Sequence, residues 1–123
     1  MIPWLLAFVF TQAIEMPIYR KGARATWAEA FGASALTHPM VWFVLPGWVR
    51  DGYVAWLAPH PSLRLDSSGQ WLLMLVVVET FAVLVEAAYL AYLRRPRPLL
   101  WSLVANASSA GLGLLCRRIF GYP

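Results

Sequence analysis

Long apolar runs alternate with short polar connections along this chain, and the pattern predicts an all-α, polytopic membrane protein. The longest uninterrupted run covers residues 71–93, with no Lys, Arg, Asp, Pro or Gly. At about 1.5 Å per residue, a helix of that length crosses the roughly 30 Å hydrocarbon core of a bilayer. Four such runs predict a four-transmembrane-helix bundle with helices at about 1–19, 25–46, 71–93 and 99–116. We expect residues 1–123 to form a single membrane domain.

The connection at 48–70 is the longest of the polar segments. Between residues 49 and 57 its apolar and aromatic residues recur at helical spacing, with Arg50 and Asp51 off that face. This pattern is typical of a short helix that lies in the membrane interface. We therefore expect an outer loop with an interfacial helix between the second and third spans, the second span ending at Pro46.

Composition agrees with a membrane protein, and the positions of Lys and Arg favour one orientation of the chain. Hydrophobic residues make up 60% of the chain and charged residues 13%, against roughly 25% charged residues in a soluble domain. The net charge of +4 does not indicate nucleic-acid binding, because Lys and Arg cluster beside the apolar runs instead of forming a basic stripe. The numbers of Lys and Arg residues on the two sides favour loops 20–24 and 94–98 in the cytoplasm and both termini outside. We expect a multi-pass protein of a cell inner membrane.

Two acids in the third run are the first candidates for function. Glu79 and Glu86 are seven residues apart, so their carboxyl groups share one helix face. A carboxylate that faces lipid costs several kcal/mol, so this face is expected to point at protein or at a wet cavity. The helical rise places His38 at the depth of Glu79, and Glu15 and Asn106 near the depth of Glu86.

Other polar residues lie on the same predicted faces. Thr11 shares a face with Glu15, and Ser34 shares one with His38, where Pro39 is expected to kink the helix. On the fourth helix, small and polar residues form a stripe that suits close packing: Ser102, Asn106, Ser109 and Gly113. Each group also has a structural interpretation, since Glu15 is close enough to pair with Arg20 or Arg24, and Asn106 and the serines are typical of hydrogen bonds between helices.

Three functions are compatible with this pattern. The first is proton or cation handling, as transport or an ion-coupled site, by Glu79, Glu86, His38 and Glu15, supported by Asn106, Ser109, Ser34 and Thr11. The second is an intramembrane metal site or enzyme that uses Glu79, Glu86 and His38 for a Zn, Mn or Fe ion, although the sequence requires no cofactor. The third is a structural or assembly subunit whose acids meet basic residues of a partner helix.

Missing catalytic motifs, the expected partners and the direction of the acids help to choose among these three functions. HExxH, GxSxG and Cys-His motifs are missing, and Cys116 is the single cysteine, so the sequence does not favour an enzyme. The expected partners are the lipid bilayer and either further copies of the chain or other membrane subunits. The direction in which the acids face separates the functions: acids that converge inside the bundle favour the first two, and acids on its outer surface favour the third.

The small size, the four predicted spans and a Glu in the first helix resemble the small multidrug resistance transporters. This resemblance implies that Glu15 is a proton and cation site. It covers only that acid and the helix count, because the long second loop, the His38-Pro39 pair and the two acids of the third helix depart from the family's pattern.

Overall fold

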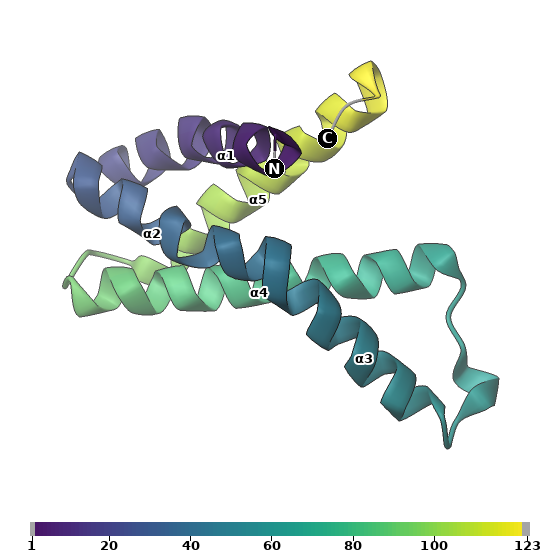
Figure 1. Cartoon of the computed structure of the whole chain (residues 1–123). Coiled ribbons are helices and arrows are strands. Elements are labelled where there is room, and N and C mark those ends of the chain that lie inside the picture. The colour runs from purple at the N-terminus through teal and green to yellow at the C-terminus, as the bar shows by residue number, and fades with distance from the viewer. Residues whose placement is uncertain (1, 122–123) are drawn as a thin grey trace.

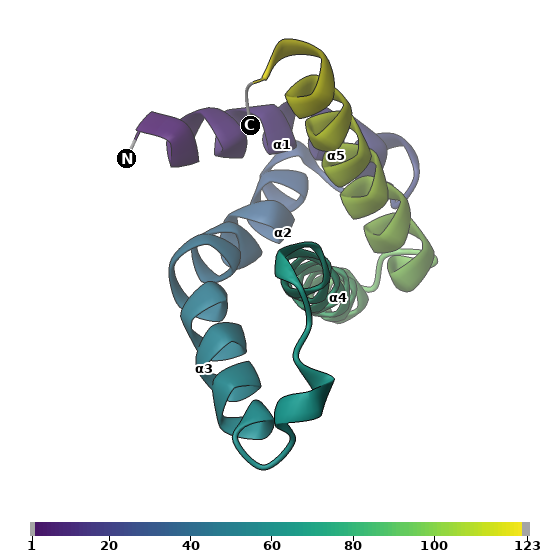
Figure 2. The ribbon, with the colours of Figure 1, turned by 90° about the vertical axis from the view of Figure 1, so that its right-hand side faces the viewer.

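Helix α4 (Ser67–Tyr92) is the longest element, and most of the other helices pack along it. The computed structural model describes residues 2–121, which contain four further α-helices and no strand: α1 (Ile2–Lys21), α2 (Trp27–Pro39), α3 (Leu45–Leu57) and α5 (Pro98–Phe120). Helices α2, α3 and α5 contact α4, while α1 crosses between α2 and α5 (Figures 1 and 2). The predicted all-helical fold is confirmed.

The second predicted helix, at 25–46, is the element that the sequence pattern described least well. Helix α2 ends at Pro39, a π-helical turn (Met40–Val44) follows, and α3 then continues through Pro46 to Leu57 in a new direction (Figure 1). The expected end at Pro46 is therefore wrong. Pro46 lies in the first turn of α3, where its missing N–H group is tolerated. In the π turn, the N–H of Leu45 donates to the carbonyl of Met40, five residues back.

The connections α1–α2 and α4–α5 lie at the same end of the structure (Figure 1). Arg95 joins them, because one guanidinium nitrogen lies 2.6 Å from both carboxylate oxygens of Glu29 and another lies 3.0 Å from the carbonyl oxygen of Arg24. Glu29 also closes a capping box with Thr26 at the start of α2. This ion pair ties the α4–α5 connection to the first turn of α2.

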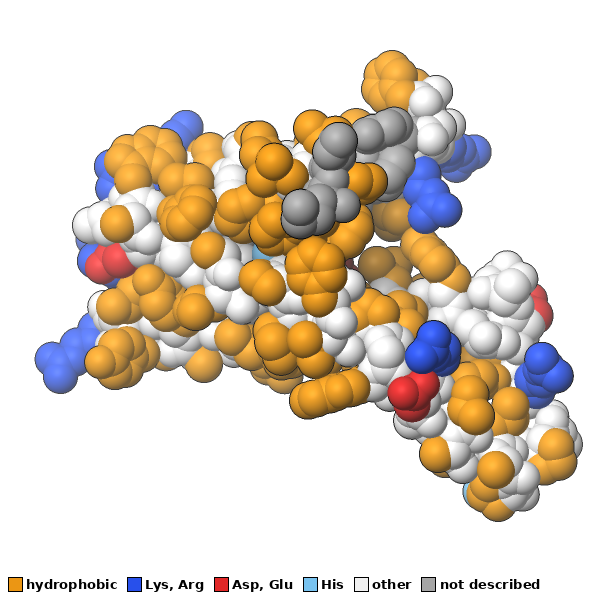
Figure 3. Space-filling model, viewed as in Figure 1, with side chains coloured by type: hydrophobic (Ala, Val, Ile, Leu, Met, Phe, Trp, Pro, Cys, Tyr) orange, Lys and Arg blue, Asp and Glu red, His pale blue; other side chains and the backbone are white. Residues whose placement is uncertain are grey.

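Polarity is distributed in the opposite sense to a water-soluble protein. Apolar side chains cover much of the surface, and Lys and Arg gather towards its ends (Figure 3). The core cluster consists largely of alanine: Tyr19, Ala23, Ala25, Ala30, Ala33, Leu90 and Ala105. The buried polar residues outnumber the members of this cluster: Gln12, Glu15, Ser34, Thr37, His38, Glu86, Ser102, Asn106 and Ser109. Small residues let the helix backbones approach closely enough for these polar groups to meet.

Two helices, α4 and α5, are long and apolar enough to cross a membrane. The four expected spans are therefore confirmed only in part. Helix α1 carries Gln12 and Glu15 within its apolar stretch, and α2 is only 13 residues long before the π turn.

Close approach at the loop end gives a test of this packing. A β-carbon at Gly22 would overlap the indole ring of Trp101 on α5, so we expect Gly22→Ala to lower the free energy of unfolding by about 1–3 kcal/mol. Gly47→Ala is the matched control. No described atom lies within 4 Å of a β-carbon built at Gly47, so stability there should stay equal or rise. Thermal unfolding in detergent measures both, and equal melting temperatures for the two variants would contradict the α1–α5 packing.

Candidate functional site

Glu86 of α4 is the most highly connected polar side chain of the interior. It is 1% exposed and accepts a hydrogen bond from each of three other helices. Tyr19 of α1 and Asn106 of α5 donate to Oε2, the latter at 2.7 Å, and Thr37 of α2 donates to Oε1 at 2.7 Å. One carboxyl group thus joins α1, α2, α4 and α5.

Glu15 of α1 is the second buried acid, also 1% exposed. Ser34 of α2 and Ser109 of α5 donate hydrogen bonds to its carboxyl group, the latter at 2.6 Å. The alternative in which Glu15 pairs with Arg20 or Arg24 is wrong for the described residues. The guanidinium of Arg20 instead donates to the carbonyl oxygen of Ala25 at 2.8 Å, since Glu15 faces inwards, away from the loop.

Both acids have hydroxyl partners with a choice of acceptor. The Ser109 hydroxyl lies 2.6 Å from Glu15 and 3.1 Å from the backbone carbonyl of Asn106. Likewise, the Thr37 hydroxyl lies 2.7 Å from Glu86 and 3.2 Å from the carbonyl of Ser34. A hydroxyl has one proton to donate, so each can serve a carboxylate, or turn to the backbone and accept from a protonated carboxyl group. The network accommodates either protonation state without moving a helix.

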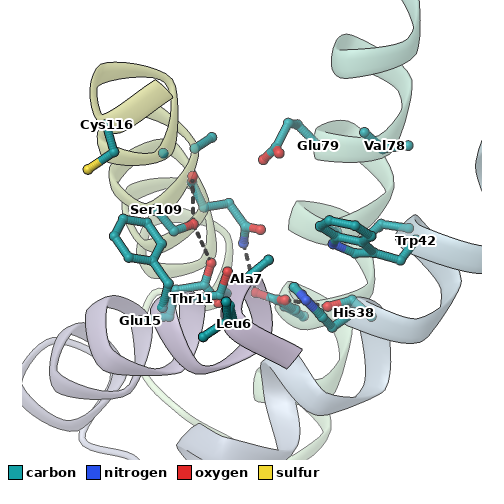
Figure 4. Close-up of a pocket in the computed structure, with 18 of the residues that line it drawn as sticks. Leu6, Ala7, Thr11, Glu15, His38, Trp42, Val78, Glu79, Ser109 and Cys116 are labelled. Atoms are coloured by element: carbon teal, nitrogen blue, oxygen red, sulfur yellow. Dashed lines mark hydrogen bonds between the residues drawn. The ribbon is translucent and has the colours of Figure 1, made fainter. Parts of the chain in front are cut away.

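A cavity of about 550 Å³ opens beside this network. Its wall includes Glu15 from α1, His38 from α2, Glu79 and Glu86 from α4, and Asn106 and Ser109 from α5. In Figure 4, Glu79 points into the cavity from one side, Glu15 and Ser109 lie across from it, and His38 and Trp42 form a third side. The molecular surface is hollowed where α5 diverges from α4 (Figure 3). The two buried acids therefore lie in the wall of a chamber.

Glu79 and His38 differ from the connected acids. Within residues 2–121 no hydrogen bond joins Glu79 to another residue, and it is only partly buried. The His38 ring lies among aromatic rings, with centroids 5.0 Å from Phe8 and 6.0 Å from both Trp4 and Trp42. Its Nε2 atom is buried and has no hydrogen-bond partner among the described residues. Glu79 thus presents an unused carboxyl group at the cavity, while the Nε2 atom of His38 is enclosed in its wall.

The structure brings together most of the residues that the sequence singled out. Glu15, Glu86 and Asn106 form one connected layer, with Ser34 and Ser109 in it, and Thr11 lines the cavity. Glu79 and His38 share the cavity without a hydrogen bond between them. The small polar stripe of α5 does pack inwards, since Ser102 donates to the carbonyl oxygen of Val83 at 2.8 Å.

Sequence reasoning missed two donors, Tyr19 and Thr37. Tyr19 follows Glu15 by four residues and so lies on the same helix face, and Thr37 follows Ser34 by three. That spacing was a usable signal. The role of Tyr19 as a hydrogen-bond donor was not recognised, because an aromatic residue beside a basic loop is also typical of a membrane-interface anchor.

Within residues 2–121, no three His, Cys, Asp or Glu side chains are grouped closely enough to hold a metal ion. Glu79, Glu86 and His38, the suggested ligands, line one cavity without forming such a group. The metal-site hypothesis therefore lacks a ligand set in the described part of the chain.

No protein-family model matches the chain, and neither a curated protein nor a solved structure matches it.

The contacts predict different stability costs for the two acids of α4. Glu86→Ala removes an acceptor that three buried donors share, so we expect a loss of about 2–5 kcal/mol in the free energy of unfolding. Glu79→Ala removes no hydrogen bond and should cost about 1 kcal/mol or less. Denaturant unfolding in mixed micelles measures both variants. Equal costs would show that the contacts of Glu86 do not hold the bundle together.

Proposed function

We propose that the protein is a small integral membrane protein that handles protons or cations through the cavity lined by Glu15, Glu79, Glu86 and His38. The observation that carries this proposal is the convergence of Glu15 and Glu86 inside the bundle, where every hydrogen-bond donor to them in residues 2–121 is a neutral group. A buried carboxylate without a cationic partner is costly. A proton or a cation from the cavity would supply the missing positive charge.

The proposed membrane arrangement has four spans: α1, α2 with the π turn, α4 and α5. The apolar surface and the polar interior support it, since a bilayer leaves apolar side chains on the outside and polar groups among the helices. In this arrangement α3 lies near the outer interface, loops 20–24 and 94–98 are cytoplasmic, and both termini are outside, as the count of basic residues favours. The membrane is the inner membrane of the cell.

The hydroxyl groups beside the two buried acids indicate how each carboxyl group would take up a proton. When a proton arrives at Glu15, the carboxyl group becomes a donor, and Ser109 can accept from it while turning its own proton to the Asn106 carbonyl. Thr37 offers the same choice beside Glu86. Glu79, which is more exposed than Glu15 and Glu86, would receive the ion first, and the His38 ring is a second titratable group in the wall.

The direction of the acids also weighs against the subunit hypothesis. A subunit that paired its acids with a partner's Arg or Lys would carry them on the outer surface. Here Glu15 and Glu86 are 1% exposed and saturated by donors of the same chain. Association with further copies or other subunits remains compatible with the proposal, because the apolar outer surface is free to bind them.

Ion flux into liposomes tests the proposal. We expect the parent protein to carry protons or cations down a gradient, and Glu15→Gln or Glu86→Gln to lower that flux by roughly tenfold or more, because an amide cannot take up a proton or balance a cation. Ser109→Ala should lower proton flux by a smaller factor, since one alternative acceptor is lost. A pH-sensitive dye inside the vesicles reports the proton rate.

Glu29→Gln is the matched control for these variants. It removes one carboxylate of the same chain at the loop end, outside the cavity, and should leave the flux unchanged. If Glu15→Gln and Glu86→Gln insert, fold and carry the same flux as the parent, the proposal that these acids handle ions fails.

A further inference from the structure

A second cavity, of about 420 Å³, lies between α3 and the first turns of α4. Its wall is apolar along both helices, with Val54 and Leu57 on α3 and Leu73 and Met74 on α4. Because the π turn directs α3 away from α4, the two helices diverge, and the segment between them joins their far ends (Figure 1). We refer to this cavity as the α3–α4 groove.

The connecting segment is fixed in place by hydrogen bonds. The Tyr53 hydroxyl accepts from the backbone N–H of Leu65 at 2.7 Å, and the Gln70 side chain donates to the carbonyl of Leu65 at 2.9 Å. Asp66 caps α4 by accepting from the N–H of Gly69 at 2.7 Å. These bonds hold Arg64, two residues before Asp66, at the wall of the groove.

The charges at the groove are of one sign. Arg50 and Arg64 line it, and no carboxylate does so among the described residues. Arg50 bonds to Asp51 through Nε alone, at 3.1 Å, which leaves its two terminal nitrogens available. Within residues 2–121, Arg64 takes part in no side-chain hydrogen bond or ion pair. Guanidinium groups bind phosphate oxygens by two parallel hydrogen bonds, so the arginines in the wall of this groove suit a phosphate.

We propose that the α3–α4 groove binds an anionic phospholipid, with the phosphate at Arg50 and Arg64 and an acyl chain against the apolar walls of α3 and α4. An apolar channel next to two arginines matches a molecule with a charged head and a hydrocarbon tail, and anionic lipids are attracted to basic groups at the membrane surface. The inference rests on the proposed membrane placement of α3 and α4. It is independent of ion handling by the first cavity.

The test compares lipids and charge-matched variants. The purified full chain in detergent is mixed with phosphatidylglycerol or phosphatidylcholine, and bound lipid is measured by native mass spectrometry alongside the melting temperature. We expect phosphatidylglycerol to bind and to raise the melting temperature more than phosphatidylcholine does. In the double variant Arg50→Gln/Arg64→Gln, phosphatidylglycerol binding should fall by roughly tenfold or more.

Two further variants identify the site. Arg117→Gln/Arg118→Gln removes the same charge at the end of α5 and should keep the lipid effect. Leu73→Trp keeps the charge but fills the groove, and should lose the effect. Equal binding of the two lipids, or equal losses in the two arginine double variants, would overturn the proposal.

Failure of this inference is distinguishable from failure of the proposed function. In phosphatidylcholine vesicles the Arg50→Gln/Arg64→Gln variant should carry ions at the parental rate, and Glu86→Gln should still bind phosphatidylglycerol. A variant that loses flux but still binds phosphatidylglycerol reports on the first cavity alone. A variant that loses phosphatidylglycerol binding but keeps its flux reports on the groove alone.

Discussion

The structure depends on one buried carboxyl group, that of Glu86, whose bonds to α1, α2 and α5 determine how the helices meet. Placing an acid among helices is costly unless its oxygens are satisfied, and here Tyr19, Thr37 and Asn106 satisfy them. The alanines of the core make this possible, because large side chains at these positions would hold the backbones too far apart for the donors to reach. The polar interior therefore depends on the small-residue packing, because the donors reach the buried carboxyl group only where the helices lie close together.

The hydrogen-bonded interior encloses a cavity instead of a filled core. Hydrogen bonds position Glu15 and Glu86 in the wall of the first cavity, while Glu79 and the Nε2 atom of His38 remain without a bond partner among the described residues. The π turn after Pro39 follows directly on His38 and turns α3 outwards. This one local break in a helix therefore contributes to the side of the first cavity formed by His38 and Trp42 and to the groove between α3 and α4.

Much of the fold could be predicted from the sequence because apolar runs of helical length indicate helices directly, and α1, α4 and α5 follow them. The seven-residue spacing of Glu79 and Glu86 correctly indicated a shared face at a cavity. The continuation past Pro46 was not predictable, because a proline in the first turn of a helix and a proline that ends one look alike in sequence. Nor did the pattern assign Tyr19 to Glu86, since this contact between residues 67 positions apart depends on tertiary packing.

Infrared difference spectra of the protein in bilayers test the central claim most directly, because they show whether the interior carboxyl groups exchange protons or cations with the outside. The spectra are recorded while the pH or the cation composition of the bath is changed. We expect a carboxyl signal in the parent that is reduced in Glu15→Gln and in Glu86→Gln and is retained in Glu29→Gln. A carboxyl signal that the interior substitutions leave intact, or no signal at all, would contradict the proposal that these acids handle ions.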